Sequence, residues 1–370
     1  MIYFDNAATS GFKPSASVNS AINAIKYLNA NPGRGSHKLS ILAEEFVFRT
    51  RVKLSKTFNN EHIDRVIFTK NCTESLNTAI FSLAKPNSEV VTTVTEHNSV
   101  LRPLFAMQRR FGVKIKFAKP KLDRITKDDI LPLVSKDTSL VVLNAVSNVT
   151  GQKNDFEDIG KHLSCPLVLD GAQACGHIDI NLKEINANCL AVAGHKGLYS
   201  TQGIGALIFD GETEIEPLTY GGSGADTFLE VPLYYPEKLE AGTLNLPAIC
   251  SLFDGTDYAL ENLNLSNKRL INNTDVIISY LKKIGAKVYS EKNPFGIVAF
   301  SLSKSSFEVS DLLSTKYEIL VRGGYHCAPK MHEFLKTKES GLVRVSLAMQ
   351  NSESEIERFL MAITEINNSL

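Results

Sequence analysis

Gly194-His195-Lys196-Gly197 is the stretch that decides how this chain is interpreted. It lies one predicted element downstream of Val168-Leu169-Asp170-Gly171, an apolar run that ends in an acid. Apolar, β-branched runs of this kind are typical of buried parallel strands, and α/β sheets bind their ligands beyond the carboxyl ends of such strands. An acid and a glycine-flanked lysine are therefore expected close to one ligand.

Pyridoxal phosphate suits this pair of residues. It needs a lysine amine for its Schiff base and a carboxylate that keeps its ring nitrogen protonated, so that the ring can accept electrons. Lys196 and Asp170 would supply these groups. The alternative is that Asp170 caps a turn and Lys196 is an ordinary solvated lysine, which is common for charged residues.

Composition narrows the class of protein. The chain has 370 residues, which favours two domains, and its 43% hydrophobic and 22% charged content fits a globular enzyme. With 40 basic and 40 acidic residues the net charge is zero, which argues against a nucleic-acid or membrane partner. No apolar run reaches the ~20 residues of a membrane span, and the first residues do not resemble a signal peptide. We expect a cytoplasmic location.

The six cysteines include no C-x-x-C pair, so we expect no metal site. An intracellular chain would keep them reduced, mostly as small core residues. Cys327 is the exception discussed below.

Helical and extended patterns alternate from about residue 39 to 210, which predicts βαβ units and an α/β fold with a mostly parallel sheet. The pattern changes after a long helical region at 247–284, and a smaller α+β domain is expected there. The strands expected are 65–69, 89–93, 113–117, 140–143, 166–169, 190–193, 204–209, 296–302 and 343–347, and the helices 41–58, 74–83, 98–110, 308–314, 329–335 and 353–366.

Thr69-Lys70-Asn71-Cys72-Thr73-Glu74 follows a predicted strand and opens a helix. Free N–H groups at a helix start, with the hydroxyl of Thr73, favour a phosphate site, although an ordinary N-cap explains the pattern equally well. The chain has no P-loop motif. Gly203-Ile204-Gly205 lacks the third glycine of a dinucleotide fingerprint, so NAD is disfavoured.

Polar residues also follow the next strands. His97 could stack on a flat cofactor ring and exchange protons with it, or it could be a capping or surface histidine. Asn148 could donate to a phenolic or carboxylate oxygen, or make an Asx turn. Gln173, three residues beyond Asp170, could reach the same ring oxygen.

The second region carries the glycine-rich loop Arg322-Gly323-Gly324-Tyr325-His326-Cys327-Ala328-Pro329. A thiol beside a helix start becomes nucleophilic, whereas the alternative is a buried, inert cysteine. Arg344, on a predicted strand, could bind a substrate carboxylate with its planar fork, or lie on the surface of an edge strand.

In this order, from Tyr3-Phe4-Asp5-Asn6-Ala7-Ala8-Thr9 to Arg344-Val345-Ser346, the motifs resemble those of the class V aminotransferase-fold, pyridoxal-phosphate-dependent cysteine desulfurases and selenocysteine lyases. The resemblance implies the type I PLP-dependent transferase fold. It predicts a large domain at 15–255 with a mostly parallel seven-stranded sheet, and a small α+β domain made of 1–14 and 256–370. The short loop at 324–329 resembles the compact catalytic-cysteine loop of the sulfur-mobilisation desulfurases.

The resemblance also implies roles for individual residues. Lys196, Cys327 and His97 would be catalytic. Arg344, Asn148 and Ala8 would bind the substrate, L-cysteine or L-selenocysteine. The segment ending in Thr243 resembles one that reaches the phosphate of a partner subunit, which implies a homodimer. The residues implied to bind the cofactor are Cys72, Thr73, His97, Asn148, Asp170, Gln173, His195, Lys196 and Thr243.

The implied activity converts L-cysteine to L-alanine and leaves a persulfide on Cys327 for a sulfur-acceptor protein. Alternatives are a selenocysteine lyase, a class V aminotransferase or lyase that does not use Cys327, and a scaffold without turnover. The chain departs from the pattern at Ala193, where relatives usually have serine or threonine, and at Cys72, which replaces a common hydroxyl residue. Each change removes a hydroxyl contact to the phosphate.

Overall fold

The apolar runs form a seven-stranded sheet in the computed structural model, which describes residues 1–121 and 123–368. The strand order is β2-β8-β7-β6-β5-β3-β4, and all neighbouring pairs are parallel except the two made by β8. The predicted mostly parallel α/β sheet is therefore confirmed. Its strands are β2 (Val66–Thr69), β3 (Glu89–Thr93), β4 (Lys114–Ala118), β5 (Thr138–Asn144), β6 (Leu167–Asp170), β7 (Cys189–Ala193) and β8 (Gly205–Phe209).

Helices cover both faces of this sheet, which explains why its strands are continuous apolar runs. In β7, Leu190 and Val192 face one core while Cys189, Ala191 and Ala193 face the other. The first core includes residues of α2 (Lys38–Thr57), α6 (Phe156–His162) and α8 (Leu246–Glu261), and the second those of α3 (Cys72–Leu83) and α4 (Asn98–Phe111). Further helical segments are α1 (Ser15–Tyr27), α5 (Lys127–Ile130), α7 (Leu182–Ile185) and the 3-10 turns Ile63–Arg65 and Leu131–Leu133.

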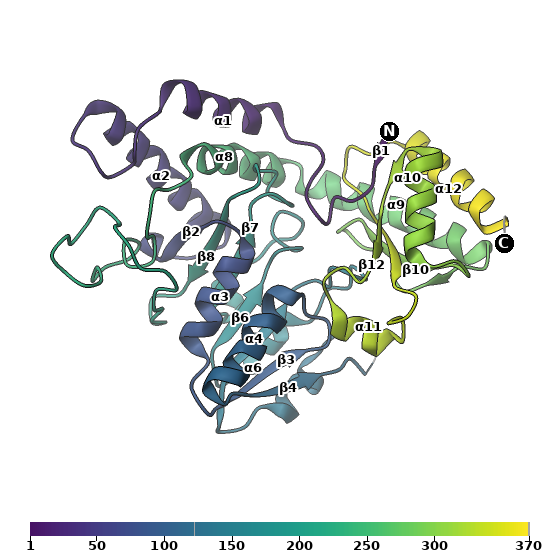
Figure 1. The fold of residues 1–370 in the computed structure, drawn as a ribbon, viewed down its shortest axis with the longest axis horizontal. Coiled ribbons are helices and arrows are strands. Elements are labelled where there is room, and N and C mark those ends of the chain that lie inside the picture. The colour runs from purple at the N-terminus through teal and green to yellow at the C-terminus, as the bar shows by residue number, and fades with distance from the viewer. Residues whose placement is uncertain (122, 369–370) are drawn as a thin grey trace.

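A smaller lobe carries both chain ends (Figure 1). Its antiparallel sheet has the order β12-β13-β10-β9, and β1 pairs in parallel with β11 beside it. The chain begins in this lobe and then crosses to α1 on the large lobe (Figure 1). Its elements are β1 (Ile2–Tyr3), α9 (Leu263–Lys283), β9 (Lys287–Val288), β10 (Ile297–Ser301), α10 (Ser306–Tyr317), β11 (Ile319–Leu320), β12 (Arg322–Gly324), α11 (Pro329–Leu335), β13 (Leu342–Ser346) and α12 (Glu353–Asn368).

The long helical region expected at 247–284 is divided at Asn262, where α8 ends and α9 begins. Helix α8 packs against α1 and α2 in the large lobe, whereas apolar residues of α9 belong to the core of the small lobe. The division into 15–255 and 1–14 with 256–370 remains a prediction about folding units.

Every strand of the large sheet except β8 ends at the same edge. Each of these strands is followed by a turn, so the turns after β2, β3, β5, β6 and β7 are neighbours in space. Within the described residues, none of the helices combines the length and apolarity that a membrane crossing requires.

Candidate active site

The turns at this edge enclose a cavity of about 220 Å³. Its wall contains most of the residues predicted from sequence to act together, and it draws on both lobes. Cys327 and Thr243 are not part of this wall. The predicted residues that line it are Ala8, Cys72, Thr73, His97, Asn148, Asp170, Gln173, His195, Lys196 and Arg344.

Lys196 enters the cavity from a turn between β7 and β8. The turn is closed by hydrogen bonds from the Tyr199 N–H to the Lys196 carbonyl (3.0 Å) and from the Ser200 N–H to the Gly194 carbonyl (2.9 Å). Glycine is required at 197, because a Cβ there would lie 2.3 Å from the Cys175 carbonyl oxygen. The turn therefore has little freedom.

Asp170 lies at the end of β6 in the same cavity and is buried. Its Oδ1 accepts from the Ala172 N–H (2.9 Å) and lies 3.5 Å from the Cys72 thiol. Burial raises the pKa of Asp170 and lowers the pKa of Lys196, and the opposite charge of each partner acts against these shifts. A lower pKa increases the fraction of Lys196 that is present as the neutral, nucleophilic amine.

His97 caps the start of α4 and lines the cavity. Its Nδ1 accepts from the Ser99 N–H (3.1 Å), so the neutral ring carries its proton on Nε2. Burial, reinforced by the positive charges of Lys196 and Arg322, lowers the pKa of His97 to about 4. The capping interpretation and the site interpretation therefore hold together: one ring nitrogen caps the helix, and the other remains available.

Helix α3 begins at the cavity, as the sequence predicts. Asn71 is the N-cap, and its side chain accepts from the Glu74 N–H (3.0 Å). Cys72 and Thr73 occupy the first turn and line the cavity, and first-turn N–H groups have no partner within a helix. The ordinary cap thus leaves the anion-binding groups of the helix start free.

Arg344 reaches the cavity from β13, which lies between β12 and β10 in the small sheet. The side chain is buried rather than on an exposed edge. Nη1 donates to the Asn148 carbonyl (2.9 Å) and Nη2 to Asp5 Oδ1 (2.8 Å). Among the described residues Nε has no partner, which leaves one edge of the guanidinium for a ligand.

Asn148 and Gln173 connect the cavity to other segments. Asn148 Nδ2 donates to the His326 carbonyl (2.7 Å), and its buried Oδ1 has no hydrogen-bond partner in the described chain. Gln173 Nε2 donates to the carbonyl of Ala7, next to Ala8 (3.0 Å). Both amides thus hold the cavity wall while retaining groups that can meet a ligand.

Cys327 lies in a tight loop just before α11. His326 and Cys327 have φ values of 48° and 56°, a left-handed conformation that is strained in residues other than glycine. The loop is held by the Asn98 N–H, which donates to the Cys327 carbonyl (2.7 Å). The half-buried thiol accepts from Arg322 Nη2 at 3.6 Å, and Arg322 lines the cavity.

Comparison with known proteins assigns the fold and the family. The family model described as Aminotransferase class-V matches residues 2–359. The chain belongs to this family. It is 31% identical to a probable cysteine desulfurase of Pyrococcus abyssi, over 100% of this chain and 95% of the relative. The apo structure of a cysteine desulfurase from Thermococcus onnurineus superposes with a TM-score of 0.90 at 30% identity, covering 100% and 95% of the two chains. A cysteine desulfurase of Wigglesworthia glossinidia is 29% identical over 100% of this chain and 93% of the relative.

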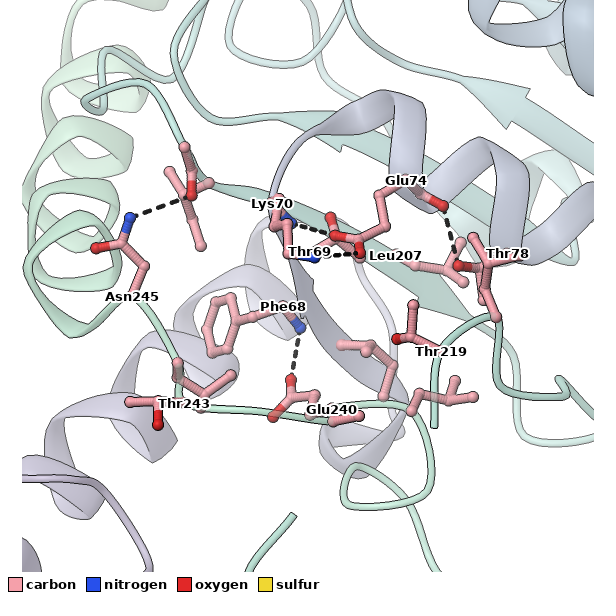
Figure 2. Close-up of a pocket in the computed structure, with 17 residues that line it drawn as sticks. Phe68, Thr69, Lys70, Glu74, Thr78, Leu207, Thr219, Glu240, Thr243 and Asn245 are labelled. Atoms are coloured by element: carbon pink, nitrogen blue, oxygen red, sulfur yellow. Dashed lines mark hydrogen bonds and ion pairs between the residues drawn. The ribbon is translucent and has the colours of Figure 1, made fainter. Parts of the chain in front are cut away.

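In this class V aminotransferase-family chain, Thr243 lies outside the cavity that contains Lys196. Thr243 lines a separate cavity next to β2, together with Thr69, Lys70 and Glu240 (Figure 2). Glu240 is buried, accepts from the Phe68 N–H (2.6 Å) and pairs with Arg51, with 2.8 Å between Nη1 and Oε1. This segment is therefore firmly held, but away from the cavity that Lys196 of the same chain occupies.

Two further residues of this class V chain contribute to the site, although the sequence patterns assign them no role of their own. Asp5 and Arg322 were quoted only as parts of longer motifs. Asp5 holds Arg344, and Arg322 joins the cavity to Cys327. Each stands in a stretch that carries the family resemblance, Asp5 in Tyr3–Thr9 and Arg322 in the glycine-rich loop, and this is the signal in the sequence that points to both.

Proposed function

We propose that this protein is a pyridoxal-phosphate-dependent cysteine desulfurase that converts L-cysteine to L-alanine and leaves a persulfide on Cys327. The observation that carries the proposal is the shared cavity of Lys196, Asp170 and Arg344, with Arg322 bridging it to the Cys327 thiol. The end-to-end similarity to proteins named cysteine desulfurase supports it.

The residues present fit pyridoxal phosphate. No described residue forms a hydrogen bond or ion pair with Lys196 Nζ, and the buried His195 Nδ1 and Asn148 Oδ1 also lack partners. Lys196 would bind the aldehyde, Asp170 the ring nitrogen, and the α3 start with Thr73 and His195 the phosphate. When bound, the ring withdraws the electrons left on a substrate carbon that has lost its proton.

The substrate is placed by groups of the small lobe. A carboxylate would meet the free Nε edge of Arg344, whose other edge is held by Asp5 and the Asn148 carbonyl. An α-amino acid held in this way lies between Lys196 and the loop of Cys327. The neutral Lys196 amine would take the α-proton, and the ammonium so formed would return a proton later in the reaction. The neutral His97 ring would assist by donating a hydrogen bond from Nε2–H beside this transfer.

Cys327 performs the sulfur chemistry. Its thiolate sulfur forms a bond to the sulfur of L-cysteine, the carbon–sulfur bond breaks, and the electron pair of that bond remains on carbon. Protonation of this carbon gives alanine, and the enzyme keeps the sulfur as a persulfide. Arg322 stabilises negative charge on sulfur, because it donates to Sγ.

We further propose a homodimer and a sulfur-acceptor protein. Thr243 is exposed and does not line the cavity of its own Lys196, which suits a residue that serves the phosphate site of a second copy. Phe228, Leu233 and Tyr234, in the loop that precedes it, are exposed apolar side chains that a partner subunit would cover. The persulfide on Cys327 requires a thiol of another molecule to remove it.

The test is turnover of L-cysteine by protein saturated with pyridoxal phosphate, with Lys196→Ala as the control. We expect equimolar alanine and sulfur, a protein mass increase of one sulfur atom on Cys327, and neither product with the control. Pyruvate in place of alanine would contradict the proposal in favour of β-elimination. Turnover of L-selenocysteine alone would also contradict it and would identify a selenocysteine lyase.

A further inference from the structure

The carbonyl oxygen of His195, immediately before Lys196, accepts hydrogen bonds from four donors of one short segment. The donors are the Ser10 N–H (3.1 Å), Ser10 Oγ (3.0 Å), Thr9 Oγ1 (3.3 Å) and Lys13 Nζ (3.0 Å). A carbonyl oxygen has two lone pairs, so two donors would satisfy it. The segment therefore concentrates more donors on this oxygen than satisfying it requires.

Lys13 is the charged member of this group. Its ammonium is partly buried and also donates to Ser10 Oγ (2.6 Å), and it forms no ion pair with any described residue. Burial lowers the pKa of Lys13 to about 8, which shows that the site disfavours its charge. Removing a cation from water without a carboxylate partner is unfavourable, so stability alone does not account for a lysine here.

The clamped oxygen belongs to the peptide unit whose nitrogen is that of Lys196. Gly194 and Gly197 flank the two residues, and glycine backbones are the least restricted of all. The direction in which the Lys196 side chain leaves the backbone thus depends on what holds this peptide. The bonds that close the turn use the carbonyls of Gly194 and Lys196, so the N-terminal segment is what holds the carbonyl between them.

The same cation also acts on His195. Burial is the main reason that the pKa of His195 is lowered to about 4, and the positive charges of Lys196 and Lys13 lower it further. The imidazole is therefore neutral at physiological pH, and its buried Nδ1 has no partner in the described chain. A neutral His195 with a fixed backbone is suited to meet a bound anion by hydrogen bonding.

We propose that Lys13 is a positioning residue for Lys196: its ammonium clamps the His195 carbonyl and thereby sets the path of the Lys196 amine into the cavity. This inference rests on the proposed function, because it takes Lys196 to bind pyridoxal phosphate. It predicts an effect on cofactor capture that is separate from turnover.

The experiment follows capture of pyridoxal phosphate by apo-protein, using stopped-flow absorbance and borohydride trapping mapped to Lys196. The variants are Lys13→Met, Lys13→Arg and, as a matched control, Lys26→Met at an exposed lysine of α1. We expect capture to slow roughly tenfold in Lys13→Met, as for one lost hydrogen bond to a charged group, with Lys13→Arg and Lys26→Met within about twofold of wild type. A Ser10→Ala variant, which loses one neutral donor, should slow capture by roughly threefold.

The pH at which the bound cofactor changes its absorbance provides a second readout. The charges that act on Lys196 are those of Asp170, Cys72, Arg344 and Arg322, so this midpoint should stay unchanged in Lys13→Met and Lys13→Arg, while of these two variants capture slows in Lys13→Met alone. Wild-type capture rates in both Lys13→Met and Ser10→Ala would overturn the inference, as would equal slowing in Lys26→Met. If Lys13→Met does not fold, Ser10→Ala alone decides. Failure of the wild-type protein to capture the cofactor would instead refute the proposed function.

Discussion

The Lys196 turn and the Cys327 loop both present a reactive side chain after a glycine and a histidine, but the backbone treats them differently. No residue of Gly194–Gly197 has a positive φ, although Tyr199, three residues beyond the lysine in the same turn, has a φ of 53°. The turn is fixed by its own bonds and by the N-terminal segment. In the Cys327 loop, Gly324, His326 and Cys327 all have positive φ, at 107°, 48° and 56°. The first turn is clamped and has ordinary backbone at its reactive residue, whereas the second loop has left-handed backbone at the cysteine itself.

This difference matches the two tasks proposed for these residues. A lysine that holds a cofactor needs one fixed direction, which a well-bonded turn with ordinary backbone at the lysine provides. A cysteine that takes sulfur from a substrate inside a cavity and passes it to a molecule outside has to serve two places. Strained backbone persists only where surrounding contacts impose it, and here Asn98 and Asn148 hold the loop through its carbonyls.

The largest effect that tests this comparison is expected when one of two thiols is removed, either that of Cys327 in its loop or that of Cys72 beside Asp170. Cys327→Ala should abolish persulfide formation and lower alanine production by roughly 10³-fold or more, since the nucleophile is lost. Cys72→Ala removes the same atom beside Asp170, and it should keep persulfide formation because the clamped side needs no thiol. Mass spectrometry of the protein and an alanine assay measure both. Equal loss of persulfide in the two variants would refute the division of roles.

A second prediction concerns whether water reaches the buried residues that pack against the Lys196 turn. His177 is packed against Gly197, where a Cβ would lie 2.9 Å from its ring, and burial lowers the pKa of His177 to about 4. In the unfolded chain, His177 binds a proton near pH 6.5. Its contribution to the free energy of unfolding is therefore complete above that pH and is lost as the pH falls toward 4. The loss from this one group amounts to at most about 3 kcal/mol.

His177→Phe should therefore flatten the fall in unfolding free energy between pH 6.5 and 4, although His97 and His195 leave part of the slope. Urea unfolding at several pH values measures this, with His162→Gln at a partly exposed histidine as the control. An unchanged slope in His177→Phe would show that water reaches the Lys196 turn, and the contrast between the two regions would weaken.

A third prediction addresses the Cys327 side. Arg322 donates to Sγ across 3.6 Å, so Arg322→Met should remove the positive charge beside the reacting sulfur and slow alkylation of Cys327 by roughly threefold. Arg110→Met, at an exposed arginine of α4, is the matched control and should leave the rate unchanged. Iodoacetamide labelling followed by peptide mapping gives the rate for Cys327 alone. Alkylation at the wild-type rate in Arg322→Met would show that Arg322 does not influence the reactivity of the thiol.

Local burial patterns could be predicted from the sequence, whereas pairing between distant residues could not. Strands such as β7 could be predicted because both of their faces are buried, and the turns that follow these strands meet at one edge of the sheet. The pairing of Asp5 with Arg344 could not, because it joins residues 339 positions apart. The break at Asn262 was also missed, because helical pattern continues through it and only packing on two different lobes separates α8 from α9.

The smallest effect is expected at Ala193, which lines the cavity at the end of β7 and is buried. Ala193→Ser would add a hydroxyl that donates to a bound phosphate, tightening pyridoxal phosphate binding by about 1 kcal/mol. Without the cofactor the same hydroxyl faces the cavity, where water can bond to it, so the stability of the apo-protein should change little. Ala191→Ser is the control, because Ala191 faces the same core but does not line the cavity. Ala191→Ser should destabilise the protein both with and without the cofactor. A gain in cofactor affinity in Ala191→Ser would show that general loosening of β7, rather than a phosphate contact, causes the effect at position 193.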